Sequence, residues 1–325
     1  MGLKKICAGI KKYNNFLITA HTNLEGDALG SELAFYALII KLGKQGIILN
    51  EDSIPYGHDF LPGIKRIRKL DCCSSYIKFD CLVVLDCADL KRTGDVWRLN
   101  KDSKPILNID HHISNQGFGD VHWVDAHASS CSEMVYRIYK QMRLSISKPE
   151  AIAMYTGMMT DTGSFRYSNT TSFTHQAVAE LLEFNINVPL IYRYVYENFA
   201  LEETELLIKL LSKINFSAQG KIAYFKLKRG MLKDGAISMD LGDQLLSFAR
   251  AIKGVEVVAL FKESLRAKNQ VRINLRSHGK VDVNKIAAIF GGGGHKTAAG
   301  CTAHGDINQV IKNVLASIHQ DLKYS

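Results

Sequence analysis

The most constraining feature of this sequence is a series of short apolar segments, each of which ends at a histidine or an aspartate. The clearest are FLITA before His21, CLVVL before Asp86 and PILNI before Asp110. Their length is typical of buried strands rather than of helices. Because helical patterns separate these segments, the sequence predicts a parallel, doubly wound α/β sheet whose polar residues gather at one edge.

The alternation of strands and helices extends to about residue 185. A further strand is predicted over 46–50, and helices are predicted over 28–43 and near 129–143, 149–160 and 171–184. Pro189 then interrupts the pattern. A segment with acidic residues in its first turn and apolar residues at helical spacing predicts a connecting helix over 201–214.

A second and smaller domain of mixed α/β type is predicted for the rest of the chain. Strand-like segments cover 216–227 (with a central turn), 255–261 and 270–277, and helical patterns lie near 240–250, 282–290 and 307–320. The predicted division is therefore a metal-binding catalytic domain over 1–190, a linker helix over 191–214 and a substrate-binding domain over 215–325.

Charge is distributed unevenly between the two parts. Residues 1–190 carry 21 basic and 20 acidic side chains, whereas residues 191–325 carry 20 and 12. The basic second part favours an anionic partner, although a basic surface that serves only solubility remains the alternative.

Other features of the composition predict a cytoplasmic protein. The sequence has neither an uncharged apolar run long enough to span a membrane nor the apolar stretch of a signal peptide behind its basic N-terminus. Seven cysteines without a C-x-x-C pair are typical of reduced thiols.

Carboxylates and imidazoles follow the predicted strands, and they suggest a metal site. Glu25 and Asp27 lie in HTNLEGDALGS beside His21, and Asp161 lies in GMMTDTGSF. Together with Asp86 they form a set of carboxylates that would repel one another in one cleft unless cations neutralised them. Oxygen and nitrogen ligands without thiolates favour two ions such as Mn²⁺, a pair suited to attack on phosphorus.

Each of these residues also has a simpler interpretation. A single His21 or Asp86 after a strand is more often a cap or a turn residue, and Asp161 alone could be an N-cap. The adjacent pair His111–His112 after an aspartate is rarer and favours contact with metal or phosphate. The joint pattern, with one member at the end of each strand, favours a metal centre.

A glycine-rich segment, FGGGGHKTAAG (290–300), is the second candidate site. Its glycines would let backbone amides approach an anion, and His295 and Lys296 could face that anion. It differs from a P-loop, because His295 precedes the lysine and a helical pattern rather than a strand comes before the glycines. A flexible loop is the alternative, but the nearby Arg272 and Arg276 favour an anion site.

The motifs resemble those of the DHH phosphoesterases in order and spacing. They are HTNLEGDALGS, DCADLKRTG (86–94), NIDHHISNQGFGD (108–120), TDTGSFRYSNT (160–170) and FGGGGHKTAAGC. More narrowly, they resemble the oligoribonuclease and pAp-phosphatase (NrnA-like) branch with its DHH-associated C-terminal domain. The resemblance covers nearly the whole chain and implies two domains joined by a linker helix, with the active site in the cleft between them.

The resemblance also implies roles for individual residues. One Mn²⁺ is expected near His21, Glu25 and Asp86, and a second near Asp27, Asp86, His111 and Asp161, so that Asp86 bridges the ions. Asp110 is expected to orient the imidazoles and His112 to contact the reacting phosphate. Glu25 is a departure, since the family usually has Asp there. Substrate contacts are predicted for Ser114, Asn115, Arg272, Arg276, Gly292, Gly293, Gly294 and His295.

The sequence thus predicts a Mn²⁺-dependent phosphohydrolase that degrades very short RNA to 5′-mononucleotides and removes the 3′-phosphate of pAp. Mg²⁺ or another divalent ion is an alternative cofactor, and a homodimer is among the expected assemblies. One alternative function is a phosphodiesterase for c-di-AMP, pGpG or inorganic polyphosphate. Another is a non-catalytic nucleotide- or RNA-binding module.

Overall fold

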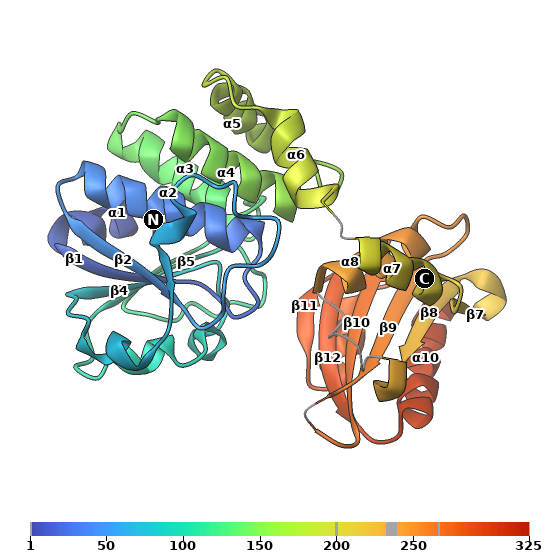
Figure 1. Ribbon diagram of the computed structural model, residues 1–325. Helices are drawn as coiled ribbons and strands as arrows, with labels where there is room; N and C mark the ends of the chain where they lie inside the picture. The colour runs from blue at the N-terminus through green and yellow to red at the C-terminus, as the bar shows by residue number, and fades with distance from the viewer. Residues whose placement is uncertain (1, 199–200, 232–238, 266, 325) are drawn as a thin grey trace. The chain divides into compact units, whose positions relative to one another are not determined.

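The protein is described by a computed structural model that covers residues 2–198, 201–231, 239–265 and 267–324. It divides into two compact units, Met1–Asn198 and Phe199–Ser325, and each contains its own sheet (Figure 1). The boundary falls within the predicted linker 191–214, of which residues 199 and 200 lie outside the described residues. On either side of them are helices α6 (Val188–Tyr196) and α7 (Leu201–Leu211).

The first unit is built on a parallel sheet whose described strands have the order β3-β2-β1-β4-β5-β6. The strands are β1 (Asn15–Thr19), β2 (Gln45–Asn50), β3 (Ile67–Lys69), β4 (Cys81–Leu85), β5 (Ile106–Asp110) and β6 (Val121–Val124). Every neighbouring pair is parallel, which confirms the predicted fold class. The strand order reverses between β1 and β4, where sheets of this type bind ligands.

Helices cover one face of this sheet. They are α1 (Gly2–Lys12), α2 (Gly26–Lys41), α3 (Cys131–Met142), α4 (Lys148–Asp161) and α5 (Ser172–Leu182). Helices α2, α3 and α4 pack against one another (Figure 1) and share the largest apolar core. A smaller cluster that includes Leu17, Leu82 and Val96 fills the other face, beneath short 3₁₀ turns.

Three elements of the first unit escape the sequence patterns. Strands β3 and β6 have three and four residues, too few to show a period. Helix α1 carries four lysines and was not recognised as a helix, yet Ile6 and Ile10 are buried in the core. Short edge strands and an N-terminal helix owe their structure to packing rather than to local pattern.

The second unit has a mixed sheet whose described strands have the order β11-β12-β10-β9-β8-β7. They are β7 (Asn215–Ser217), β8 (Ile222–Leu227), β9 (Val257–Glu263), β10 (Gln270–Ser277), β11 (Gly293–His295) and β12 (Ala298–His304). Only β8 and β9 are parallel neighbours. Helices α9 (Val283–Ile289) and α10 (Ile307–Tyr324) cover one face, and α7 and α8 (Met239–Arg250) contribute to the core on the other.

The glycine-rich segment forms the edge strand β11 rather than an irregular loop. Gly294 has φ 150°, and a Cβ there would lie 2.5 Å from the Ala298 carbonyl oxygen. Gly292 is equally restricted, because its Cβ would lie 2.1 Å from the oxygen of Gly300. Gly292 and Gly294 are therefore required for the close approach to β12.

The structure also bears on the cysteines and on the length of the apolar helices. All seven cysteines lie within the described residues, and each is a free thiol. Within the same residues, no helix is long and apolar enough to cross a membrane.

A buried polar network fixes the end of β1, next to His21. The Asn50 side-chain oxygen accepts hydrogen bonds from the Thr19 hydroxyl (3.1 Å) and the Ala20 amide (3.0 Å). Its nitrogen donates to Glu32 at 2.9 Å. Burial raises the pKa of the Glu32 carboxyl to about 8, so the folded protein favours the protonated form.

We expect Glu32→Gln to stabilise the first unit increasingly as the pH rises. The pKa of Glu32 is higher when folded (about 8) than its ordinary value of 4.5, so its stabilising contribution is lost as pH rises between these values. The difference in unfolding temperature between variant and wild type should be near zero at pH 5 and several degrees at pH 8.5. Tryptophan fluorescence is suitable, because Trp97 and Trp123 both belong to the first unit.

The exposed Glu183 provides a control, since Glu183→Gln should produce no pH-dependent difference. A constant difference between wild type and Glu32→Gln across this pH range would contradict the assigned protonation of Glu32.

Candidate metal centre

The candidate site lies at the carboxyl ends of β1, β4 and β5. His21 comes two residues after β1, and Asp86 directly follows β4. Asp110 is the last residue of β5, and His111 and His112 follow it. Asp86 has φ 52°, a left-handed conformation that is uncommon for residues other than glycine and frequent at functional sites.

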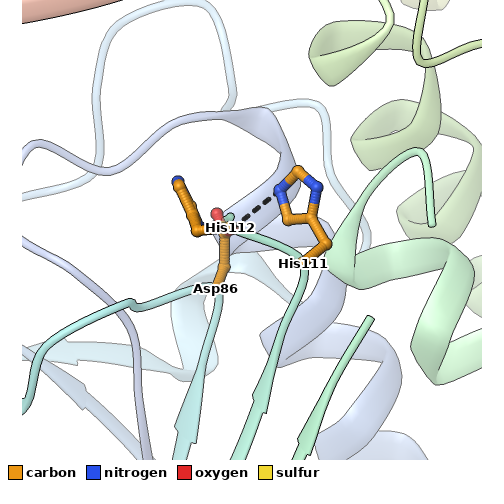
Figure 2. Close-up of side chains that lie close together, drawn as sticks. All are labelled: Asp86, His111 and His112. Atoms are coloured by element: carbon orange, nitrogen blue, oxygen red, sulfur yellow. Dashed lines mark ion pairs between the residues drawn. The ribbon is translucent and has the colours of Figure 1, made fainter. Parts of the chain in front are cut away.

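Asp86 is surrounded by three imidazoles. Its Oδ2 lies 3.3 Å from His21 Nε2, and its Oδ1 lies 3.4 Å from His111 Nε2 and 3.6 Å from His112 Nδ1. Figure 2 shows the rings of His111 and His112 on either side of the carboxylate. Asp86 is buried, and its Oδ1 has no hydrogen-bond partner within the part of the chain that the structure describes.

The imidazoles determine the charge of Asp86. Burial alone would raise the pKa of this carboxyl, but His111 and His21 hold it well below its usual range. In turn, burial would lower the pKa of His21, whereas Asp86 raises it to about 9. The centre is therefore organised around an ionised carboxylate in a buried position.

A second group joins Asp27 and Asp161 to His111. The ligand atoms of these three residues lie within 4.8 Å of one another, as do those of Asp86, His111 and His112. Burial and the neighbouring Asp86 raise the pKa of Asp27 to about 6, and burial raises that of Asp161 to about 7. Three carboxylates around one imidazole, two buried and one partly buried, fit a divalent cation, which would compensate their mutual repulsion.

Asp27 is held at the N-terminus of α3. Its two side-chain oxygens accept hydrogen bonds from the backbone amides of Cys131 (2.6 Å) and Ser132 (2.8 Å). Gly157 of α4 makes this arrangement possible, because a Cβ there would lie 1.9 Å from Ser132 Oγ and 2.7 Å from Asp27 Oδ1. The helix N-terminus favours a negative charge at this place.

Asp110 orients the ring of His112 through a hydrogen bond. Its fully buried Oδ1 lies 2.7 Å from His112 Nδ1, and Asn115 Nδ2 donates to its Oδ2 at 2.7 Å. The same amide group of Asn115 donates to Asn108 (2.8 Å) and to the Cys87 carbonyl (3.2 Å). The amide nitrogen of Asn115, a residue predicted to contact substrate, is therefore bonded within the protein.

The remaining predicted residues lie in different settings. Glu25 is the exposed N-cap residue of α2 and belongs to neither of the two groups of ligand atoms. Ser114 is exposed in the loop after β5. In the second unit, Arg276 Nη2 bonds Asp243 Oδ1 at 2.7 Å, Arg272 is exposed on β10, and His295 ends β11.

Some residues of the site were not singled out by the sequence patterns. Asn169 donates to Asp161, and Ser129 and Glu133 connect Asn169 to α3. Asn169 lies in the motif TDTGSFRYSNT, so its presence there was the one available signal. The backbone amides that bind Asp27 have no signature in the sequence.

Replacing Asp86 should change the protonation of His21. In metal-free protein we expect Asp86→Asn to lower the pKa of His21 from about 9 to below its ordinary value of 6.5, because burial then acts without the opposing carboxylate. Asparagine tolerates the left-handed backbone at this position. Titration of the histidine Cε1–H signals by NMR measures the change.

The exposed Asp102 offers the matched control, and Asp102→Asn should leave the His21 titration as in wild type. A His21 pKa that stays near 9 in Asp86→Asn would show that another group holds its charge.

Comparison with known proteins gives a consistent result. The chain matches the DHH family, N-terminal domain, over residues 15–158 and the DHHA1 domain over residues 219–323. A bifunctional oligoribonuclease and PAP phosphatase NrnA of Thermus thermophilus is 30% identical over 308 residues, covering 94% of this chain and 89% of the relative. A probable protein of the same name from Streptococcus mutans is 30% identical over 322 residues, covering 96% and 98%.

A solved structure also resembles this fold. An exopolyphosphatase-related protein from Bacteroides fragilis has a TM-score of 0.86 and 26% identity, covering 99% of this chain and 96% of that one. These matches confirm the resemblance predicted from the motifs. The chain therefore belongs to the DHH family, as a phosphoesterase whose DHH domain is followed by a DHHA1 domain.

Proposed function

We propose that this phosphoesterase degrades very short RNA to 5′-mononucleotides and converts pAp to AMP, with two Mn²⁺ ions as cofactor. The observation that carries the proposal is the convergence of three carboxylates on His111, of which Asp27 and Asp86 are buried and Asp161 is partly buried. The names of the relatives, oligoribonuclease and PAP phosphatase, support the choice of substrate.

The residues that would hold the ions are those brought together at the sheet edge. We assign one ion to His21 and Asp86 and the other to Asp27, Asp86, His111 and Asp161, with Glu25 as a further candidate for the first. Two such ions would polarise a water molecule and stabilise negative charge on the phosphate oxygens. Mg²⁺ is the alternative ion, since the ligands are hard or borderline.

His112 would act on the substrate phosphate. Because Asp110 accepts from Nδ1 at 2.7 Å, the protonated ring would present Nε2–H to a phosphate oxygen. Asp110 is fully buried and is itself fixed by Asn115, so the ring is oriented before substrate binds. Such preorganised donors stabilise charge that develops in a phosphoryl transition state.

The second unit would bind the rest of the substrate. Arg276 offers a bidentate guanidinium, which an incoming phosphate would share with or take from Asp243. Strand β11 is the last strand in the described sheet order, and Gly293 is exposed on it. Both features suit an anion, and the placement of this unit against the metal centre is part of the proposal.

The proposal extends to compartment and assembly. Seven free thiols, five of them buried, suit the reducing cytoplasm. A homodimer is the assembly we would test first, by light scattering of the purified chain.

The experiment that tests the proposal is incubation of the purified protein and Mn²⁺ with pAp, an RNA dinucleotide, an RNA 24-mer and c-di-AMP. We expect release of AMP from pAp and of mononucleotides from the dinucleotide, and slower attack on the 24-mer. Cleavage of c-di-AMP alone would favour a cyclic-dinucleotide phosphodiesterase, and binding without cleavage would favour a non-catalytic module. Removal of metal with a chelator should abolish turnover, and added Mn²⁺ should restore it.

Loss of one carboxylate should disable the enzyme. We expect Asp27→Asn or Asp86→Asn to reduce turnover of pAp by several orders of magnitude, because each removes a proposed ligand. Steady-state kinetics measures this, and Asp102→Asn should behave like wild type. Near-normal turnover in either folded variant would contradict the assigned roles.

Loss of the guanidinium should affect binding more than chemistry. We expect Arg276→Gln to raise KM for pAp about tenfold or more, since a hydrogen bond to a charged group contributes roughly 1.5–3 kcal/mol. The change in kcat should be smaller. Lys312→Gln, at an exposed site on α10, serves as the control. An unchanged KM would place the phosphate elsewhere.

A further inference from the structure

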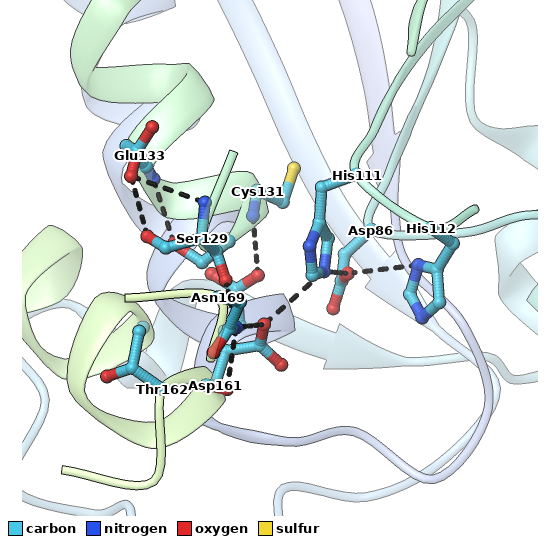
Figure 3. A network of polar contacts seen from close by, with 12 residues as sticks. Asp86, His111, His112, Ser129, Cys131, Glu133, Asp161, Thr162 and Asn169 are labelled. Atoms are coloured by element: carbon cyan, nitrogen blue, oxygen red, sulfur yellow. Dashed lines mark hydrogen bonds and ion pairs between the residues drawn. The ribbon is translucent and has the colours of Figure 1, made fainter. Parts of the chain in front are cut away.

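Asn169 lies beside the metal centre, in the segment between α4 and α5, and is not among the predicted ligands. Its side-chain nitrogen lies 2.9 Å from the Ser129 carbonyl oxygen, 3.1 Å from the Asp161 carbonyl oxygen and 3.4 Å from Asp161 Oδ2. Figure 3 shows the amide between Ser129 and Asp161. One amide group therefore contacts both the backbone and the carboxylate of a proposed ligand.

Asp161 needs such a donor because of where it lies. It is the last residue of α4, where the negative end of the helix disfavours a carboxylate. Burial adds to this effect and raises its pKa to about 7. Its Oδ2 lies between two nitrogens, Asn169 Nδ2 and His111 Nε2 (3.5 Å). Its Oδ1 makes no hydrogen bond to any group in the described ranges, so this oxygen is available to a cation.

The other end of the contact is anchored in the core. Ser129 donates through its amide (3.3 Å) and its hydroxyl (2.7 Å) to Oε2 of the buried Glu133. The Thr174 hydroxyl donates to the same oxygen at 2.8 Å, and Arg137 binds the other oxygen at 2.6 Å. Ser129 is thus held in place by Glu133, and its carbonyl oxygen accepts a hydrogen bond from the amide of Asn169.

The contacts of Asn169 are not those of a residue that serves stability alone. Its side-chain oxygen is buried and has no hydrogen-bond partner among the residues that the structure covers. The contacts of its side-chain nitrogen all go to Ser129 and Asp161.

We infer that Asn169 is a positioning residue that fixes the Asp161 carboxylate for the divalent cation, through the Ser129 carbonyl. The inference rests on the proposed function only in taking Asp161 as a metal ligand. Groups that orient metal ligands typically contribute 10- to 100-fold to metal affinity.

The test is titration of metal-free protein with Mn²⁺ by calorimetry, without substrate. We expect Asn169→Ala to weaken one of the two Mn²⁺ binding steps by about 10- to 100-fold. Asn169→Asp should be at least as weak, because it keeps the shape of the side chain but replaces the donor by a second carboxylate. Turnover of pAp by Asn169→Ala should recover when Mn²⁺ is raised, with KM for pAp near that of wild type.

Asn100→Ala is the matched control. Asn100 also makes two side-chain hydrogen bonds, both to Lys104 at 2.7–2.8 Å, and it precedes β5 at the end of that strand opposite to the site. The Asn100→Ala substitution should lower the unfolding temperature without changing the affinity for Mn²⁺. If Asn169→Asp binds Mn²⁺ like wild type, or Asn169→Ala binds it like Asn100→Ala, the inference is wrong.

The calorimetric readout also separates the two proposals. A wild-type protein that binds Mn²⁺ but cleaves neither pAp nor RNA would overturn the proposed function, and the Asn169 variants would still decide the inference. A wild-type protein that binds no Mn²⁺ would overturn the inference directly.

Discussion

The mutual repulsion of three carboxylates, two buried and one partly buried, is the constraint on which this structure depends. Asp27, Asp86 and Asp161 come from α2, the end of β4 and the end of α4, and all converge on His111. Without compensation such a group would destabilise the fold. The surrounding elements supply that compensation through imidazoles at Asp86, helix amides at Asp27 and a side-chain amide at Asp161. A divalent cation would complete it, and the arrangement therefore favours metal binding over a merely structural role.

Each of the two units has its own hydrophobic core. All proposed metal ligands belong to the first unit, whose strand order reverses between β1 and β4. The second unit has its own sheet and offers Arg276 and the edge strand β11 for an anion. Each unit thus has hydrophobic clusters of its own.

The sequence predicted strand ends better than side-chain directions. His21, Asp86 and Asp110 follow apolar runs, and the topology of a parallel sheet brings such residues together whatever their neighbours are. Asn115 and Glu25 could not be placed in this way. Packing decides whether the side chain of Asn115 faces Asp110, and it also decides whether that of Glu25 is buried or exposed. The glycine run allowed both a loop and a strand, and pairing with β12 decided between them.

The proposed ligands differ in how strongly the surrounding protein stabilises their negative charge. Asp86 lies among three imidazoles, and Asp27 accepts two backbone hydrogen bonds at the favourable end of α3. Asp161 sits at the unfavourable end of α4, with one long contact from Asn169 and one from His111. Its position therefore depends most on partners outside its own helix. Our inference therefore makes Asn169 a contributor to cation affinity that acts only through Asp161.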